Sequence, residues 1–370
     1  MAIAYAITVL VLVAAASSKW ASGCYDSIIS FGDSLADTGN LLLLRPPNNP
    51  PPSACPPYGQ TFFHRPTGRY SDGRLVIDFI AESLGLPFVE PYFAGKDAAE
   101  KGGSLSKGVN FAVAGATALE NGFLEQRGIH NPFTNVSLET QLHWFKQFLA
   151  TIPDVRNFLK SSLVVVGEIG GNDYNYALMQ RTIEAVPSLI SMVINTIGST
   201  IQELIKLGAT TILVPGDVPL GCLPIYLQKL KSSTTDTDYD PKTGCLNWPN
   251  ELSRYHNELL QKELGRVREL HPHKLTVVEV SDTGFTEGLV LRACYEHGGP
   301  SNFNESAPCG TSPAVCCDNP SSFASWDGIH YTEAAYRWIA QGLLHGPYTN
   351  PRISTICPSM SRGIDGYYEY

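Results

Sequence analysis

The feature that most constrains the fold is an alternation of continuous apolar runs with amphipathic helical patterns. The runs at 162–169, 211–214 and 275–280 are rich in β-branched residues and lack regular polar positions. Such runs are typical of strands buried on both faces of a parallel sheet. Apolar residues at helical spacing through 186–205 and 252–264 lie between them. This order predicts an α/β fold, a three-layer α/β/α sandwich with a central, mainly parallel sheet.

An earlier apolar run predicts the first strand. It ends at Phe31 and is followed by a polar turn in which Ser34 lies between Asp33 and Asp37. A helix is expected after Ser71-Asp72, which offer capping side chains, and Gly85 and Pro87 should end it. The proline-rich segment 45–52 is predicted to be a surface loop. Because no low-complexity linker or repeat divides the chain, residues 24–370 are predicted to form one domain.

The amino terminus has the pattern of a secretory signal peptide. Its apolar stretch, Ile3 to Ala16, is too short to span a bilayer comfortably, and Ala21-Ser-Gly23 fits a cleavage site. We therefore predict that residues 1–23 are removed and that the protein is extracellular, with the vacuole as the alternative destination. A lipoprotein acylation site at Cys24 is less favoured because no basic residue precedes the apolar stretch. Stable membrane insertion is not expected.

The chain has nine cysteines, which in a secreted protein predict disulfides and one unpaired thiol. Their connectivity cannot be deduced from the sequence. The adjacent Cys316 and Cys317 lack an accompanying CxxC pair, so bridges to separate partners are favoured over a metal site. Asn135 and Asn304 begin N-x-Ser triplets and are predicted glycosylation sites.

Charge and spacing argue against several other classes of function. The net charge is −9 and no Lys/Arg cluster is present, which disfavours nucleic acid or an anionic membrane as partner. The acidic segment Asp236–Asp240 begins like a calcium loop, but Pro241 occupies the required glycine position. The histidines at 143, 271 and 273 have no second ligand pair at useful spacing. We expect no metal, no cofactor and a monomer.

Polar residues at predicted strand ends and near the carboxyl terminus form a constellation suited to acyl transfer. A serine such as Ser34 is a weak nucleophile unless an imidazole accepts its proton and a carboxylate orients that imidazole. Asp327 and His330 could supply both groups from one short segment. The backbone N–H groups of Ser34 and Gly115 and the side-chain amide of Asn172 are suitable donors to the developing oxyanion.

Four segments in this order resemble the blocks of GDSL esterase/lipases of the SGNH hydrolase superfamily. They are Phe31-Gly-Asp-Ser-Leu35, the turn at Gly115, Gly171-Asn-Asp173 and Asp327-x-x-His330. Pro66-Thr-Gly-Arg-Tyr-Ser-Asp-Gly-Arg74 is similar to the secreted plant branch, which includes acetylajmalan and sinapine esterases. The resemblance covers nearly the whole mature chain and implies a flavodoxin-like strand order.

The resemblance also implies a role for each site residue. Ser34 would be the nucleophile, His330 the base and Asp327 its orienting carboxylate, while Ser34, Gly115 and Asn172 would form the oxyanion hole. The implied activity is hydrolysis of a small-molecule carboxylic ester with a small acyl group.

Three other interpretations of this constellation differ in what they require of the sequence. An α/β-hydrolase elbow is disfavoured because Ser34 follows the first strand and because Asp327 and His330 are only three residues apart. An acyltransferase would use the same acyl-enzyme, so the sequence leaves that alternative open. A non-catalytic carbohydrate-binding or cell-wall-binding relative would be expected to have lost at least one member of the constellation. The physiological ester cannot be identified from one sequence.

Overall fold

The structure of this chain is a computed structural model. It describes residues 24–100, 105–180, 182, 185–231, 235–272, 276–280, 291–296, 301–303, 315–346, 349–351 and 353–357. The predicted signal peptide at 1–23, the triplet at Asn304 and Cys309 lie outside the described residues.

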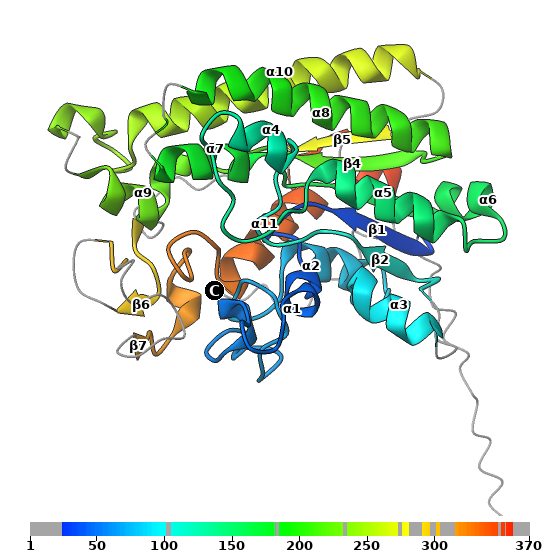
Figure 1. The fold of residues 1–370 in the computed structure, drawn as a ribbon, viewed down its shortest axis with the longest axis horizontal. Coiled ribbons are helices and arrows are strands. Elements are labelled where there is room, and N and C mark those ends of the chain that lie inside the picture. Colours follow the sequence, from blue (N-terminus) through cyan, green and yellow to red (C-terminus); the bar gives the residue numbers. More distant parts are fainter. Residues whose placement is uncertain are drawn as a thin grey trace, which may run out of the picture.

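One sheet forms the centre of the fold, with strand order β2-β1-β3-β4-β5-β8 (Figure 1). The strands are β1 (Ser27–Phe31), β2 (Gly108–Asn110), β3 (Ser162–Val166), β4 (Thr211–Pro215), β5 (Thr276–Val280) and β8 (Thr349–Asn350). The first five are parallel; β1 pairs Ile29 with Val109 on one side and Val164 on the other. Only the short β8 is antiparallel to its neighbour among the strands described in this sheet. The predicted mainly parallel sheet and flavodoxin-like order are confirmed.

Helices cover both faces of this sheet, which confirms the three-layer sandwich (Figure 1). One layer contains α5 (Leu138–Leu149), α8 (Val186–Leu207) and α10 (Asn247–Leu270). The opposite layer contains α1 (Asn40–Leu44), α2 (Val76–Ser83) and α11 (Glu333–Leu344). The other elements are α3 (Tyr92–Glu100), α4 (Asn121–Glu125), α6 (Val155–Lys160), α7 (Gly171–Met179), α9 (Pro224–Lys229), α12 (Ile353–Ile356), β6 (Tyr295–Glu296) and β7 (Val315–Cys316).

The core lies where the apolar strands meet the inner faces of these helices. Every residue of β1 and β3 is buried, as expected for strands covered on both sides. Phe31 at the end of β1 stacks on Phe111 at a centroid distance of 5.5 Å and meets the edge of Phe145 from α5 at 5.3 Å. The end of β1, where the polar turn begins, is therefore held by aromatic packing.

The start of α2 differs from the sequence-based expectation. The prediction that Ser71 and Asp72 cap this helix is wrong, because α2 begins at Val76 and the carboxylate of Asp78 accepts the Leu75 N–H at 2.9 Å. The Asp72 carboxylate instead accepts the Glu333 N–H, at 2.7 Å, at the start of α11. The true partner of Asp72 is 261 residues away in sequence, so local spacing could not reveal it.

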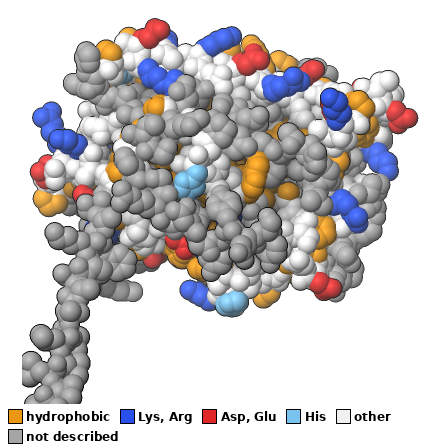
Figure 2. Space-filling view, turned by 180° about the vertical axis from the view of Figure 1, so that it is seen from behind, with side chains coloured by type: hydrophobic (Ala, Val, Ile, Leu, Met, Phe, Trp, Pro, Cys, Tyr) orange, Lys and Arg blue, Asp and Glu red, His pale blue; other side chains and the backbone are white. Residues whose placement is uncertain are grey.

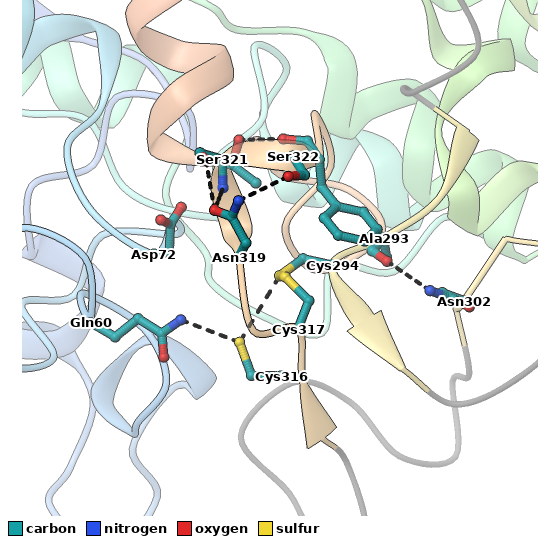
Figure 3. The surroundings of a disulfide bond; sticks show 12 residues. Gln60, Asp72, Ala293, Cys294, Asn302, Cys316, Cys317, Asn319, Ser321 and Ser322 are labelled. Carbon is teal, nitrogen blue, oxygen red and sulfur yellow. Dashed lines mark hydrogen bonds between the residues drawn. A yellow bond between two sulfur atoms is a disulfide. The ribbon is translucent and has the colours of Figure 1, made fainter.

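Three disulfides confirm the prediction that cysteines form bridges, but the prediction of a single unpaired thiol is wrong, because two cysteines of the described residues are free. The bridges are Cys24–Cys357, Cys222–Cys245 and Cys294–Cys317. Within the described part of the chain Cys55 and Cys316 are free thiols. The prediction that Cys316 and Cys317 both form bridges is therefore wrong for Cys316: its Sγ accepts the Gln60 amide at 3.3 Å and lies 4.0 Å from Cys294 Sγ (Figure 3). Its sulfur neighbours are already bonded to each other, so they are not a thiolate ligand set.

The surface carries no concentrated basic region on the face shown in Figure 2, where Lys and Arg side chains of the described residues are scattered. Asn135 is exposed, as a glycosylation site requires. None of the helices in the described ranges is long and apolar enough to cross a bilayer.

Candidate active site

The turn after β1 presents Ser34 at the carboxyl edge of the sheet. Gly32 has φ +147°, and a Cβ there would lie 2.9 Å from the carbonyl oxygens of Gly167 and Glu168. Glycine is therefore required for the chain to pass this close to the end of β3. The carboxylate of Asp33 accepts the Leu35 N–H at 3.0 Å and closes the turn around Ser34.

A second buried aspartate connects this turn to the Gly115 segment. The carboxylate of Asp37 accepts the N–H groups of Gly39 at 2.7 Å, Asn40 at 2.6 Å and Leu41 at 3.0 Å, all at the start of α1. It also accepts the Ala114 N–H at 2.8 Å, directly before Gly115. Asp37 thus fixes two of the predicted site segments relative to each other.

Ser34, His330 and Asp327 lie within hydrogen-bond distance of one another in a chain. Ser34 Oγ is 2.8 Å from His330 Nε2, and His330 Nδ1 is 2.6 Å from Asp327 Oδ2. Ser34 and His330 are 8% and 7% exposed. His330 lies in the segment directly before α11, so the sandwich brings together two groups that are 296 residues apart.

The Asp327 carboxylate is held as an acceptor on both oxygens. Oδ1 accepts the backbone N–H groups of Ile329 at 3.1 Å and His330 at 2.8 Å, and Oδ2 also accepts the Tyr58 hydroxyl at 2.8 Å. Burial by itself would raise the pKa of Asp327, but His330 and these N–H donors hold it below its ordinary value. An ionised Asp327 favours the tautomer with hydrogen on Nδ1, which leaves Nε2 free to accept the Ser34 proton.

The three residues predicted to supply oxyanion donors, Ser34, Gly115 and Asn172, line the same cavity as His330. The N–H groups of Ser34 and Gly115 donate to no group of the described residues, so both are available to a ligand. The Gly115 carbonyl accepts hydrogen bonds from Asn131 and Tyr176, both at 2.9 Å, which fixes the orientation of this turn at φ +82°. Asn172 is also present, but its amide donates to Asp33 Oδ2 at 2.8 Å and to the Ala116 carbonyl at 3.0 Å.

The cavity has a volume of about 200 Å³ and mixes polar and apolar walls. Aromatic side chains are contributed by Tyr70, Phe133 and Tyr176, and aliphatic side chains by Leu220, Leu223, Ile225 and Ile329. Tyr70 also packs against the imidazole of His330, with ring centroids 4.5 Å apart. The cavity thus places apolar contacts around the serine, as a site for a small organic molecule requires.

Comparisons with known proteins show the family of this chain. The family model for GDSL-like lipase/acylhydrolase matches residues 28–343. The chain belongs to this family. A GDSL esterase/lipase of Arabidopsis thaliana is 50% identical over 351 residues, covering 90% of this chain and 89% of the relative. A second is 49% identical over 350 residues, covering 90% and 87%. The sinapine esterase of Brassica napus is 45% identical over 363 residues, covering 92% and 91%.

The resemblance seen in the sequence is thereby confirmed, and this GDSL-family chain is a carboxylic ester hydrolase.

Three further residues at the site, Glu168, Asp217 and Tyr58, are not among those predicted from the sequence. Glu168 and Asp217 follow the ends of β3 and β4 by two residues and line the cavity, and Tyr58 contacts Asp327 from beyond the proline-rich segment. Polar groups gather at the carboxyl edge of parallel strands, so this rule could have found the two acids. No sequence signal indicates Tyr58.

Proposed function

We propose that this chain is a secreted serine esterase that hydrolyses carboxylic esters of small acyl groups through an acyl-enzyme. Ser34 is the nucleophile, His330 the general base and acid, and Asp327 the carboxylate that orients His330. The observation that carries the proposal is the continuous chain from Ser34 Oγ to Nε2 at 2.8 Å and from Nδ1 to Asp327 at 2.6 Å.

In the first half of the reaction, Ser34 Oγ attacks the ester carbonyl while His330 Nε2 takes its proton. The carbonyl oxygen becomes an oxyanion, for which the Ser34 and Gly115 N–H groups are unoccupied donors. The tetrahedral intermediate collapses, the alcohol oxygen receives the proton from Nε2, and the acyl group remains on Ser34.

The second half repeats these steps with water. His330 removes a proton from water, which attacks the acyl carbon, and the proton returns to Ser34 Oγ as the acid leaves. The role of Asn172 in both halves requires one amide hydrogen to turn from Asp33 or Ala116 towards the oxyanion, or to be shared with it.

A cavity of about 200 Å³ supports the preference for small acyl groups, since a long chain would need space beyond it. Three disulfides support folding in an oxidising compartment, as expected of a secreted protein. Secretion in turn requires a signal peptide, which we place at 1–23, ahead of a mature hydrolase domain at 24–370. It would also expose Asn135 and Asn304 to glycosylation.

Hydrolysis of nitrophenyl esters from acetyl to long-chain acyl groups tests the activity, with Ser34→Ala as the matched variant. We expect highest kcat/KM with the short esters, labelling of Ser34 by a serine-directed phosphonate, and loss of both activity and labelling in Ser34→Ala. A folded Ser34→Ala protein with unchanged hydrolysis would overturn the assignment. Adding an alcohol and comparing new ester with free acid separates hydrolysis from acyl transfer.

A further inference from the structure

Tyr58 contacts the carboxylate of the proposed triad from outside the substrate cavity. Its hydroxyl donates to Asp327 Oδ2 at 2.8 Å, and the same oxygen lies 2.6 Å from His330 Nδ1. Tyr58 is 3% exposed and is not among the described residues that line the cavity with Ser34. The proposed ester hydrolysis gives this buried phenol no step of its own.

The two oxygens of Asp327 take their donors from different parts of the chain. Oδ1 accepts the N–H groups of Ile329 and His330, which belong to the same turn as Asp327. Oδ2 accepts the Tyr58 hydroxyl, which is 269 residues away in sequence, and faces the imidazole. A hydrogen bond to a carboxylate stabilises its ionised form and weakens its attraction for other protons. Tyr58 therefore acts on the oxygen that orients His330.

Aromatic packing directs the Tyr58 hydroxyl at this oxygen. The Tyr58 ring meets the edge of Trp326, the residue before Asp327, at a centroid distance of 6.0 Å. It also meets the edge of Tyr70 at 5.7 Å, and Tyr70 packs on the imidazole of His330 at 4.5 Å. Trp326 and Tyr70 are both buried. Because these rings enclose Tyr58, its hydroxyl is oriented before a substrate binds.

The backbone on both sides of this contact is held by Asp72. The Asp72 carbonyl accepts the Thr61 N–H at 2.7 Å, three residues after Tyr58. The Asp72 carboxylate accepts the Glu333 N–H, also at 2.7 Å, three residues after His330. One aspartate thus fixes the segment that carries the phenol relative to the segment that carries the imidazole.

Two further contacts hold the residues directly after Tyr58. The Gly59 N–H donates to the Ser71 carbonyl at 3.0 Å. The Gln60 amide points towards Cys316 and donates to its Sγ at 3.3 Å (Figure 3). The phenol is therefore attached to a segment with several anchors, which suits a group that positions another side chain.

Other titratable groups also face the Asp327–His330 pair. Carboxyl groups that line the cavity belong to Asp33, Glu168 and Asp217, and phenols beside the pair belong to Tyr70 and Tyr336. Burial, and then repulsion from Glu168, raise the pKa of Asp33 and Asp217, and burial raises the pKa of Glu168 to about 7. Burial, with the charge of Asp327 as a lesser cause, raises the pKa of both tyrosines. Removing only the Tyr58 hydroxyl keeps all these groups, so a comparison with the wild type isolates Tyr58.

We propose that Tyr58 is a positioning residue that sets the basicity of His330 through Asp327. Its hydroxyl keeps Oδ2 ionised and directed at Nδ1. By sharing that oxygen, it also limits how strongly the carboxylate stabilises the imidazolium. The imidazole then remains neutral, as the base for Ser34, to a lower pH than it would beside the carboxylate alone. The inference rests on the proposed function, since it concerns the base of that reaction.

The Tyr58→Phe variant removes the hydroxyl and keeps the packed ring. With nitrophenyl acetate, the acid limb of the pH profile of kcat/KM should move to higher pH by about 0.5 to 1 unit, because His330 senses part of a hydrogen bond to a charged group. On that limb, kcat/KM should therefore be about 3- to 10-fold lower than in the wild type at the same pH. KM at high pH should change by less than about threefold, since Tyr58 does not line the cavity.

Imidazole NMR provides a measurement that does not depend on turnover. In protein labelled with ¹³C at histidine Cε1, the signal of His330 is identified by its loss in His330→Gln. Its titration midpoint should lie about 0.5 to 1 pH unit higher in Tyr58→Phe than in the wild type. The signal of the exposed His143 should titrate identically in the two proteins.

Tyr25→Phe is the matched control. Tyr25 is also buried, but it lies before β1, at the opposite end of this strand from Ser34. The loss of this hydroxyl should leave both midpoints and KM at their wild-type values.

The outcomes separate this proposal from the proposed function. An unchanged midpoint in either measurement, or an equal loss of kcat/KM at every pH, would overturn the role of Tyr58 and leave the esterase assignment intact. Absence of all hydrolysis and of Ser34 labelling would remove the esterase assignment, and the NMR midpoints would still decide whether Tyr58 acts on His330. If Tyr58→Phe does not fold, replacement of Tyr58 by 3-fluorotyrosine, a stronger hydrogen-bond donor, should lower both midpoints; unchanged midpoints would overturn the proposal.

Discussion

At the residue scale, the two aspartates beside Ser34 have different structural tasks. Asp37 accepts four backbone N–H groups and joins the serine turn to the Gly115 turn. Asp33 accepts the Leu35 N–H and the Asn172 amide, which places Asn172 beside the nucleophile. Ser34 thus lies in the sequence between two aspartates whose carboxylates position the Gly115 turn and the Asn172 amide, which are the other proposed oxyanion donors.

The Asn172→Ala variant tests whether this amide stabilises the oxyanion. We expect kcat to fall by about 100- to 1,000-fold with little change in KM, because the interaction would form only in the transition state. Steady-state kinetics with nitrophenyl acetate would measure both constants.

Asn175 supplies the matched control. It lines the cavity one turn further along α7, and its side-chain oxygen accepts the Tyr226 hydroxyl. Asn175→Ala should lower kcat by less than about tenfold. A rise in KM alone for Asn172→Ala would assign Asn172 to ground-state binding instead.

At the scale of elements, the contact between α2 and α11 positions His330. Arg74, just before α2, contacts Glu333 in the first turn of α11 at 2.8 Å and is 7% exposed. Its guanidinium also lies over the rings of Phe62 at 4.0 Å and Phe79 at 4.6 Å. Because His330 is three residues before Glu333, this contact fixes the segment that carries the imidazole.

The Arg74→Met variant should lower the free energy of unfolding by about 3 kcal/mol, since it leaves Glu333 buried with only the half-exposed Arg337 as a charged partner. Urea unfolding followed by circular dichroism would measure it. Arg254→Met, which removes an exposed pair at 3.8 Å, should cost less than about 1 kcal/mol. Equal losses in the two variants would contradict the importance of the buried pair.

The packing of α7 against α10 predicts a pH dependence of stability. His256 is buried and lies 2.8 Å from the Tyr174 hydroxyl; burial lowers its pKa to about 4. The unfolded chain, with a histidine pKa of about 6.5, binds a proton below that pH while the folded chain does not. Because of His256, the free energy of unfolding should therefore fall by about 2 kcal/mol as the pH falls from 7 to 5.

Urea unfolding of the His256→Gln variant at pH 7 and pH 5 measures the contribution of His256 to this pH dependence. The loss of stability between these two pH values should be smaller than in the wild type by about 2 kcal/mol. The exposed His143→Gln should keep the wild-type difference. Identical pH dependence in all three proteins would exclude a contribution from His256.

At the scale of the whole molecule, the Cys24–Cys357 disulfide connects the segment before β1 to the segment after α12. It closes a sequence separation of 333 residues, whereas Cys222–Cys245 closes 23. Closing the longer loop removes more conformational entropy from the unfolded chain.

Replacing both cysteines of each pair with serine compares the two. The Cys24→Ser/Cys357→Ser variant should lose about 2 kcal/mol more unfolding free energy than Cys222→Ser/Cys245→Ser, by loop entropy. Thermal and urea unfolding under non-reducing conditions would show it. A larger loss for the short loop would mean that local packing outweighs entropy.

Much of the fold could be predicted because its signals are local. The apolar runs of β3 and β4 and the helical spacing of α8 and α10 each depend on neighbouring residues, and parallel strands need helical crossovers. The order of the blocks at Ser34, Gly115, Asn172 and His330 indicated the family. The capping role of Asp72 and the free thiol of Cys316 could not be predicted, because their partners are distant in sequence.

The sequence by itself determined the strands, most helices and the residue types required for acyl transfer, since these follow from periodicity and chemical identity. Only the tertiary structure decided that Ser34 and His330 meet at 2.8 Å, that Tyr58 contacts Asp327, and that Asp33, Glu168 and Asp217 share one cavity wall. The physical reason is that distances between groups far apart in the chain depend on the order of strands in the sheet, and no local pattern encodes them.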